Sequence, residues 1–141
     1  MKTNYTITSE LQAIIPRFQL IATMEAQEET YAEALERLKT ALKLCPAIGA
    51  TARSKEHPAI FHYFFGGSDF YVCEYDPKDG LMFGYGILNG DLQNSEWGYF
   101  SVLEFAQSKY LNIDYHFPPQ TIEAALYSAY PKHFKKPQSL F

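Results

Sequence analysis

Apolar side chains recur at steps of three and four residues between about positions 27 and 44, which is the clearest periodic pattern in the chain. Such steps return to one side of an α-helix, so the pattern predicts an amphipathic helix that Pro46 ends. Its apolar stripe comprises Tyr31, Leu35, Leu38, Leu42 and Cys45. The spacing also fits a coiled-coil seam, but roughly two to three heptads are few for a partner helix, so packing on the protein's own sheet is favoured.

Two shorter helical patterns precede this helix. Ser9 and Gln12 have the spacing of a capping box, in which the Ser9 hydroxyl accepts a hydrogen bond from the Gln12 backbone N–H. A helix is therefore expected to begin there and to end or kink at Pro16. Residues 17–24 have helix-like spacing without a clear start, and the sequence leaves open whether they form helix or strand.

The period changes after a small and polar loop at residues 46–58, because strand-like, aromatic-rich segments separated by turns follow it. Strands are expected at 59–65, 69–75, 81–88 and 96–100, with a further extended segment at 112–117. The connections are turns at 66–68 and 76–80 and a loop at 89–95. Short connections make successive strands antiparallel neighbours, so the fold class expected is α+β, with an antiparallel β-meander of about four or five strands.

Two short helices are expected to pack with this meander. Ser101 and Glu104 form a second capping box, so one helix should begin directly after the strand at 96–100. Residues 120–129 predict a terminal helix that ends before Pro131 and has one apolar face, formed by Ile122, Ala125, Leu126 and Ala129. We expect a single domain over residues 1–141, made of a mostly helical region at 1–45, the sheet with its two helices at 57–130, and a tail at 131–141.

The hairpin around residues 76–80 predicts which residues lie opposite each other in the sheet. On one face the expected pairs are Tyr75 with Leu81, Cys73 with Phe83, and Tyr71 with Tyr85. On the other face they are Val72 with Gly84 and Phe70 with Gly86, joined by Gly98 and Phe100 if Trp97 lies opposite Ile87. Gly84, Gly86 and Gly98 would then line one low strip.

Glycine weakens a strand, so three glycines on one face need a reason. Packing is the favoured interpretation, with Phe70, Phe100 or the alanine face of the terminal helix filling the strip. The alternative is a shallow aromatic groove, floored by glycine, that binds a peptide or a flat small ligand.

The composition supports the predicted sheet and argues against two classes of function, nucleic-acid binding and membrane insertion. Aromatic residues make up 16% of the 141 residues, and they gather between Phe61 and Phe117, where they favour strands. The formal net charge is −4 and the basic residues are dispersed, so we expect no direct nucleic-acid binding. No apolar run approaches the ~20 residues of a membrane span, and a signal-peptide pattern is lacking, so a cytoplasmic protein that does not enter the membrane is expected.

Candidate chemistry is sparse. Cys45 and Cys73 lie in different segments without zinc-ligand spacing, and both are interpreted as small buried apolar residues. Asp114 and His116 would share one strand face, but they are too few for a metal site and Cys73 would have to join them. Satisfied structural histidines at 62 and 116 are therefore favoured, and we assign no metal and no cofactor.

Acidic side chains gather near the expected strand ends; they are Glu74, Asp76, Asp79, Asp91 and Glu96. A pair such as Glu74 and Glu96 could perform acid–base chemistry or hold a divalent ion. Turn formation and solvation explain these residues more simply, so no catalytic residue is assigned.

Several segments together resemble a known family. They are FYVCEYD at 70–76, FGY at 83–85, WGYFSVLE at 97–104 and DYHFP at 114–118. Over roughly residues 57–123, and again near 9–16, the chain resembles small bacterial proteins grouped as domain of unknown function two-nine-five-eight, from whose pattern the helix at 31–44 departs as an insertion. The resemblance implies no activity and no catalytic residue. Because such domains accompany plasmids, phages and conjugative elements, it implies an accessory role in mobile-element biology through a protein partner.

Three classes of function stay open. The first is a non-catalytic interaction module, with Tyr71, Tyr85, Trp97 and Tyr99 as candidate binding anchors, since tyrosine and tryptophan are favoured at interfaces. The second is a small-ligand or peptide-binding groove over Gly84, Gly86 and Gly98. A hydrolase that uses the acidic strand ends is a distant third.

Overall fold

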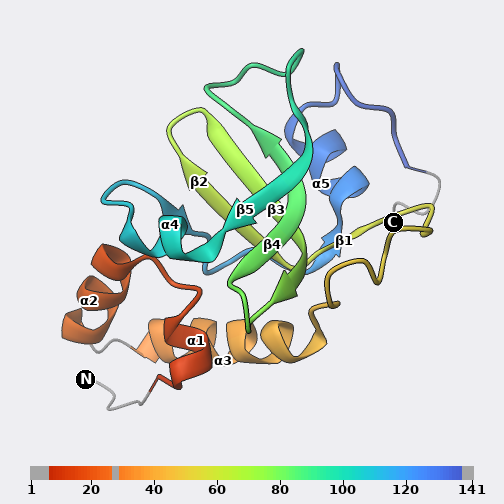
Figure 1. The fold of residues 1–141 in the computed structure, drawn as a ribbon. Helices are drawn as coiled ribbons and strands as arrows, with labels where there is room; N and C mark the ends of the chain where they lie inside the picture. Colours follow the sequence, from red (N-terminus) through yellow and green to blue (C-terminus); the bar gives the residue numbers. More distant parts are fainter. Residues whose placement is uncertain (1–6, 27–28, 138–141) are drawn as a thin grey trace.

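The fold is an antiparallel sheet with helices on both of its faces, as Figure 1 shows for the computed structural model, which describes residues 7–26 and 29–137. Three helices come first along the chain, α1 (Ser9–Gln12), α2 (Arg17–Ala26) and α3 (Glu29–Leu44). They lie together on one side of the sheet, and α5 (Ile122–Ala129) lies on the opposite side (Figure 1). The predicted α+β class is thus confirmed.

The main sheet has five strands in the order β5-β4-β3-β2-β6. The strands are β2 (Phe61–Phe65), β3 (Ser68–Asp76), β4 (Leu81–Ile87), β5 (Glu96–Ser101) and β6 (Asn112–Ile113). The first four follow each other as the predicted meander, and α4 (Val102–Gln107) begins where β5 ends, with the Ser101 side chain accepting from the Glu104 backbone N–H. The N-cap at Ser101 is as expected from the sequence.

A two-stranded sheet explains why the predicted boundaries of one strand and of the terminal helix are wrong. The strand expected at 59–65 is divided at Ile60, because Pro58–Ala59 (β1) turns away to pair with Gln120–Thr121 (β7). The terminal helix consequently begins at Ile122, with the Thr121 hydroxyl accepting from the Ala124 backbone N–H as its N-cap. The extended segment expected at 112–117 forms a strand over Asn112–Ile113 alone.

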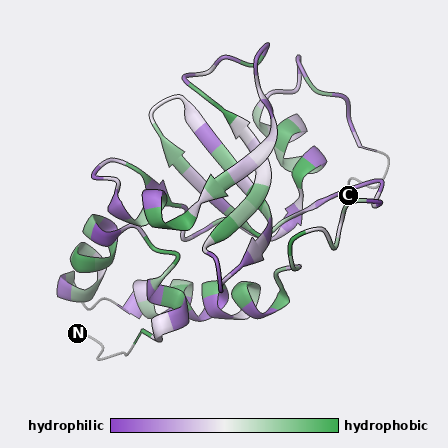
Figure 2. Ribbon diagram, in the orientation of Figure 1, coloured by the Kyte–Doolittle hydropathy of each residue, from purple (hydrophilic) through white to green (hydrophobic). Residues whose placement is uncertain are grey.

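The helical periodicity located α3 correctly and misjudged part of its buried face. Leu35 and Leu38 are buried as predicted, together with Ala34 and Ala41 on the side toward the core. Tyr31, Leu42 and Cys45 pack against this core only partly buried. Figure 2 shows the resulting alternation of hydrophobic and hydrophilic residues along α3. In α5, Ala124 is buried and the predicted Ala129 is exposed, because the helix ends there.

Residues 17–24, which the sequence left ambiguous, belong to α2. A polar contact fixes this helix to the sheet: the Gln19 side chain donates to the Ile113 carbonyl oxygen at 2.8 Å and accepts from the Ile113 N–H at 2.8 Å. An amide side chain can satisfy both backbone groups of an edge strand at once. A long-range contact that periodicity does not encode therefore orients α2.

The first helix is capped one residue earlier than the sequence predicts. The Thr8 hydroxyl, not that of Ser9, accepts from the Leu11 backbone N–H at 3.3 Å, and the Gln12 side chain donates to the Ile7 carbonyl at 2.8 Å. The predicted capping box over Ser9 and Gln12 is therefore wrong in register, since threonine caps a helix as serine does.

We expect Thr8→Ala to lower the free energy of unfolding by about 1 kcal/mol, the usual contribution of an N-cap hydroxyl. The matched variant Ser9→Ala should change the free energy of unfolding by less than about 0.5 kcal/mol, since the hydrogen bond of the Ser9 hydroxyl with the Glu10 carboxylate is exposed. Urea unfolding followed by the fluorescence of the single tryptophan measures both. A larger effect of Ser9→Ala would place the cap where the sequence suggests.

The strand pairing agrees with the predicted register on one side of a β-bulge and departs from it on the other. Tyr71 lies opposite Tyr85, Val72 opposite Gly84 and Phe70 opposite Gly86, as expected. The register then shifts between Val72 and Glu74, so that Glu74 lies opposite Phe83, Tyr75 opposite Met82 and Asp76 opposite Leu81. The predicted pairs Cys73 with Phe83 and Tyr75 with Leu81 are therefore wrong, because the bulge adds one residue to β3.

The pairing of β4 with β5 also differs from expectation. Trp97 lies opposite Tyr85 instead of Ile87, which places Gly98 opposite Gly84 and Phe100 opposite Met82. Gly98 and Phe100 still share the face of Gly84 and Gly86, because the error is an even number of residues.

Each face of the sheet has its own core. Tyr63, Val72 and Met82 pack against the N-terminal helices and α4, whereas Tyr71, Cys73 and Ile87 pack against α5. The bulge directs the Cys73 and Glu74 side chains to the same region, since both contact the Thr51 hydroxyl. Glu74 therefore joins the α5 side of the sheet.

Candidate functional site

A hollow of about 290 Å³ lies on the α5 side, between the loop that precedes β1 and the neighbouring strands β4 and β5. Its walls are Gly49, Thr51, Ala52, His57, Glu74, Phe83, Trp97 and Tyr99. Three of the residues that the sequence proposed, Glu74, Trp97 and Tyr99, thus meet in one place. They meet because the bulge in β3 turns Glu74 toward the aromatic residues of β4 and β5.

Glu74 is a carboxylate held by a loop. Its Oε1 accepts from the Gly49 N–H at 2.7 Å, and its Oε2 accepts from the Thr51 N–H at 2.8 Å and from the Thr51 hydroxyl. Only 3% of the residue is exposed. Burial alone would raise the pKa of Glu74, but these three hydrogen bonds, with the nearby His57, outweigh it and hold the pKa below its usual value. The hollow therefore carries a negative charge at neutral pH.

His57 is held between a carboxylate and an aromatic ring. Its Nδ1 lies 3.0 Å from Glu123 Oε2, and its backbone N–H donates to Glu123 Oε1 at 2.8 Å. The imidazole lies 4.6 Å from the Trp97 ring, centroid to centroid. Because Glu123 is in the first turn of α5, these contacts fix the loop, the helix and β5 relative to one another.

An aromatic surface borders the hollow. We use this name for Phe83, Trp97 and Tyr99, which lie on adjacent strands. The Phe83 ring stacks against Trp97 at 5.8 Å with 15° between the planes, and it contacts Tyr99 at 5.0 Å. Trp97 is 36% and Tyr99 62% exposed. Rings that support one another across strands lose little conformational entropy when a ligand binds.

The other proposed residues lie elsewhere. Tyr85 supports the edge of Trp97 at 5.4 Å, and its hydroxyl is hydrogen-bonded to Ser95 at 2.7 Å. Tyr71 is buried among α5 side chains and the His62 ring, so it is not accessible as an anchor. Glu96 lies exposed at the start of β5, opposite Gly86, and does not line the hollow with Glu74.

The three glycines lie on the opposite face from this hollow. A Cβ at Gly86 would meet the Phe100 and Phe70 rings at 3.3 and 3.4 Å, a Cβ at Gly84 would overlap the Tyr71 carbonyl oxygen, and a Cβ at Gly98 would meet nothing within 4 Å. Over Gly86 the strip is therefore filled by the two phenylalanines, which is the packing interpretation. The aromatic surface and the glycine strip do not form one groove.

A second polar cluster surrounds His62. Its Nε2 lies 2.7 Å from Asp69 Oδ1 and its Nδ1 3.5 Å from Asp114 Oδ2, while the Tyr130 hydroxyl donates to Asp69 Oδ2 at 3.1 Å. The imidazole stacks on Tyr71 at 4.7 Å. Asp114 thus pairs with His62, and the backbone N–H of His116 donates to Asp114 Oδ1 at 2.9 Å. Within the described ranges, His, Cys, Asp and Glu form no group of three that could hold a metal ion.

The cysteines offer no reactive thiolate at neutral pH. Burial raises the pKa of Cys73 to about 11, although its hydrogen bond with Thr51 acts in the opposite direction. Burial likewise raises the pKa of Cys45 to about 12. Both are free thiols, and a nucleophilic role requires the thiolate.

Sequence reasoning missed Thr51, His57 and Glu123. The first two lie in a loop without hydrophobic periodicity, and Glu123 lies in a short helix where it resembles an ordinary first-turn acid. Each gains its role from a contact with a residue more than twenty positions away in sequence. A sequence pattern within one element does not indicate such contacts.

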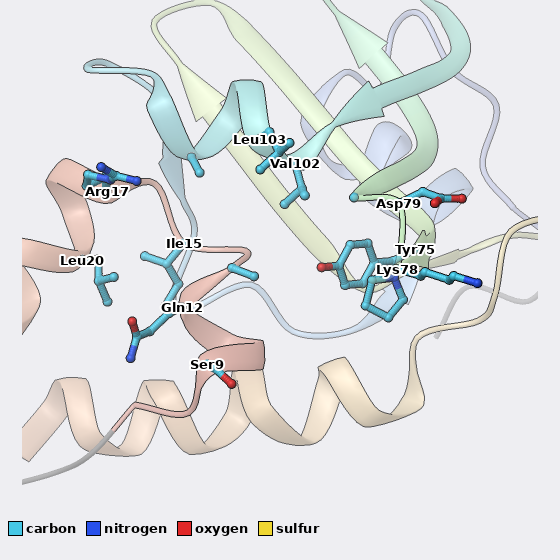
Figure 3. A pocket seen from close by; sticks show the side chains of 14 residues that line it. Ser9, Gln12, Ile15, Arg17, Leu20, Tyr75, Lys78, Asp79, Val102 and Leu103 are labelled. Atoms are coloured by element: carbon cyan, nitrogen blue, oxygen red, sulfur yellow. The ribbon is translucent and has the colours of Figure 1, made fainter.

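A cavity of about 590 Å³ lies on the other side of the sheet, between α1, α4 and the β3–β4 turn. Figure 3 shows its wall formed by Ile15, Leu20, Tyr75 and Val102, with the side chains of Lys78 and Asp79 pointing away from the space between Ile15 and Tyr75. A smaller hollow of about 430 Å³ adjoins it. These walls are mainly apolar and present no buried charge comparable with Glu74, so they indicate no particular ligand.

No protein-family model matches the chain, and no curated protein or solved structure is significantly similar to it. The resemblance to domain of unknown function two-nine-five-eight therefore stays a prediction. None of the helices in the described ranges is both long and apolar enough to cross a membrane.

Proposed function

We propose that this protein is a non-catalytic interaction module that binds a partner protein through the aromatic surface. The observation that carries the proposal is the exposure of Trp97 and Tyr99 on β5, the outermost strand on this side of the sheet. Phe83 fixes both rings from the neighbouring strand. Rigid, exposed tryptophan and tyrosine side chains are the residue types that dominate binding energy at protein interfaces.

The chemistry of the hollow favours binding over catalysis. The Glu74 oxygens already accept three hydrogen bonds from Gly49 and Thr51, so this carboxylate is poorly placed to take a proton from a substrate. Binding of a small ligand in the hollow is the second candidate, which its concave shape supports. The accessory role of a bacterial mobile-element protein, through a partner and without direct DNA contact, remains a prediction from the resemblance.

The test compares two exposed tyrosines. Tyr99→Ser should lower the affinity for a partner captured from a bacterial host lysate by about tenfold or more, whereas Tyr110→Ser should leave it within about twofold. Tyr110 is a suitable control, because it is 67% exposed and lies outside the aromatic surface. Affinities are measured by calorimetry with the purified partner.

Two results would contradict the proposal. Equal partner binding by the Tyr99→Ser variant and the unchanged protein would exclude the aromatic surface. Repeated recovery of a small metabolite without any protein would favour the second candidate.

A further inference from the structure

We propose that the hollow beside Trp97 binds the guanidinium group of an arginine side chain. This inference rests on the proposed function, because the arginine would belong to the protein partner that the aromatic surface binds. It identifies the chemistry of the contact in the hollow that the aromatic surface borders.

Charge is the first argument. Glu74 forms part of the hollow and is only 3% exposed, so its negative charge is poorly screened by water. None of the described residues that line the hollow is lysine or arginine, and the one basic group there, His57, is paired with Glu123. Arg53 and Lys55 are on the same loop, but they are exposed and do not line the hollow. A cationic group would therefore be attracted there.

The aromatic rings select the kind of cation. Phe83, Trp97 and Tyr99 line the hollow with their rings in mutual contact, and cations are attracted to the faces of aromatic rings. The carboxylate of Glu74 offers charge but little further hydrogen-bonding capacity, because three donors already occupy its oxygens. A lysine ammonium would lose strong hydration without replacement, whereas a guanidinium is weakly hydrated and stacks flat on aromatic rings.

Size is the third argument. The hollow of about 290 Å³ lies at the lower limit of ligand pockets, which usually begin at about 300 Å³. That volume suits the end of one long side chain better than a larger cofactor. Because the hollow opens beside the exposed Trp97 and Tyr99, a side chain can enter while its backbone stays outside.

The single tryptophan provides a direct measurement, because Trp97 lines the hollow. Titration with Nα-acetyl-L-arginine amide at constant ionic strength should change the Trp97 fluorescence saturably, with a dissociation constant of the order of millimolar. Nα-acetyl-L-citrulline amide, which has the same shape without the charge, should bind at least about tenfold more weakly. The lysine analogue should lie between the two.

Two variants test the residues. Glu74→Gln should weaken arginine binding at least about tenfold, with its folded state checked by circular dichroism at the temperature used. Should that variant not fold, Tyr99→Leu removes an exposed ring without touching the buried network and should weaken arginine binding at least about threefold.

The outcomes separate this inference from the proposed function. Equal responses to arginine and citrulline, or no saturable response to arginine, would overturn the inference. If Tyr99→Ser still lowered partner affinity about tenfold or more in that case, the aromatic surface would remain the interface and the guanidinium site alone would be wrong. If arginine bound as expected but partner affinity were unaffected by Tyr99→Ser, the site would stand and the proposed function would fail.

Discussion

Gly84→Ala is expected to lower the free energy of unfolding by about 3 kcal/mol or more, a large effect for one methyl group. A Cβ at this position would lie 1.8 Å from the carbonyl oxygen of Tyr71 and 3.0 Å from Cα of Val72, and both are backbone atoms of the neighbouring strand. Backbone atoms next to a β-bulge cannot rotate away as a side chain does, so β3 and β4 would have to separate locally.

Gly98→Ala is the matched control, because Gly98 lies directly opposite Gly84 in the sheet and a Cβ there would meet nothing within 4 Å. That variant should be neutral or more stable by up to about 1 kcal/mol, since alanine loses less backbone entropy than glycine on folding. Gly86→Ala should lie between the two, because the Phe100 and Phe70 rings must shift slightly. Urea unfolding measures all three, and equal effects of Gly84→Ala and Gly98→Ala would contradict this account.

These glycines show how much of the sheet the sequence predicts. Alternation and turn residues located the four strands of the meander and placed Gly84, Gly86 and Gly98 on one face. They did not reveal the bulge near Cys73, because aromatic and apolar residues continue through it and a period of two conceals one extra residue. The close approach at Gly84 follows from the three-dimensional path of the strand.

For the helices too, the sequence predicts the features that depend on local spacing and misses those that depend on distant contacts. The Ser101 cap and the extent of α3 follow from local spacing and were predicted. The Thr8 cap was misplaced by one residue because Thr8 and Ser9 are both good capping residues. Pairing between β1 and β7 moved the start of α5 to Ile122, and that pairing joins segments about sixty residues apart. Local helix propensity does not indicate that residues 120–121 pair with β1 instead of joining the helix.

The sequence predicted some residues of the candidate site and missed others. Trp97 and Tyr99 are conspicuous because they lie in an aromatic strand, whereas Glu74 is one of several acids near the expected strand ends. Glu74 differs from Glu96 because the backbone N–H groups of Gly49 and Thr51 donate hydrogen bonds to the Glu74 carboxylate. Hydrogen bonds from a loop, and not charge or spacing in the strand, therefore separate the two acids.

Glu74→Gln is expected to lower the free energy of unfolding at pH 7 by about 2–4 kcal/mol. A neutral amide would place an N–H₂ group against donors that a carboxylate now satisfies. The buried N–H of Thr51 and the part-buried N–H of Gly49 would both lose a charged acceptor. The matched change Glu96→Gln, at an exposed position of β5, should alter the same quantity by less than about 0.5 kcal/mol.

The pH dependence of the stability lost in Glu74→Gln tests whether the ionised form of Glu74 is the cause of that loss. The pKa of Glu74 in the native protein is below its ordinary value of 4.5, so the unfolded state binds the proton more readily. The stabilisation is therefore fully present above about pH 5 and is lost as the pH falls through the native pKa. Urea unfolding between pH 7 and the acid limit should show the gap between the unchanged protein and Glu74→Gln narrowing below pH 4.5. A gap independent of pH would mean that shape, and not charge, is what the loop at Gly49 and Thr51 recognises.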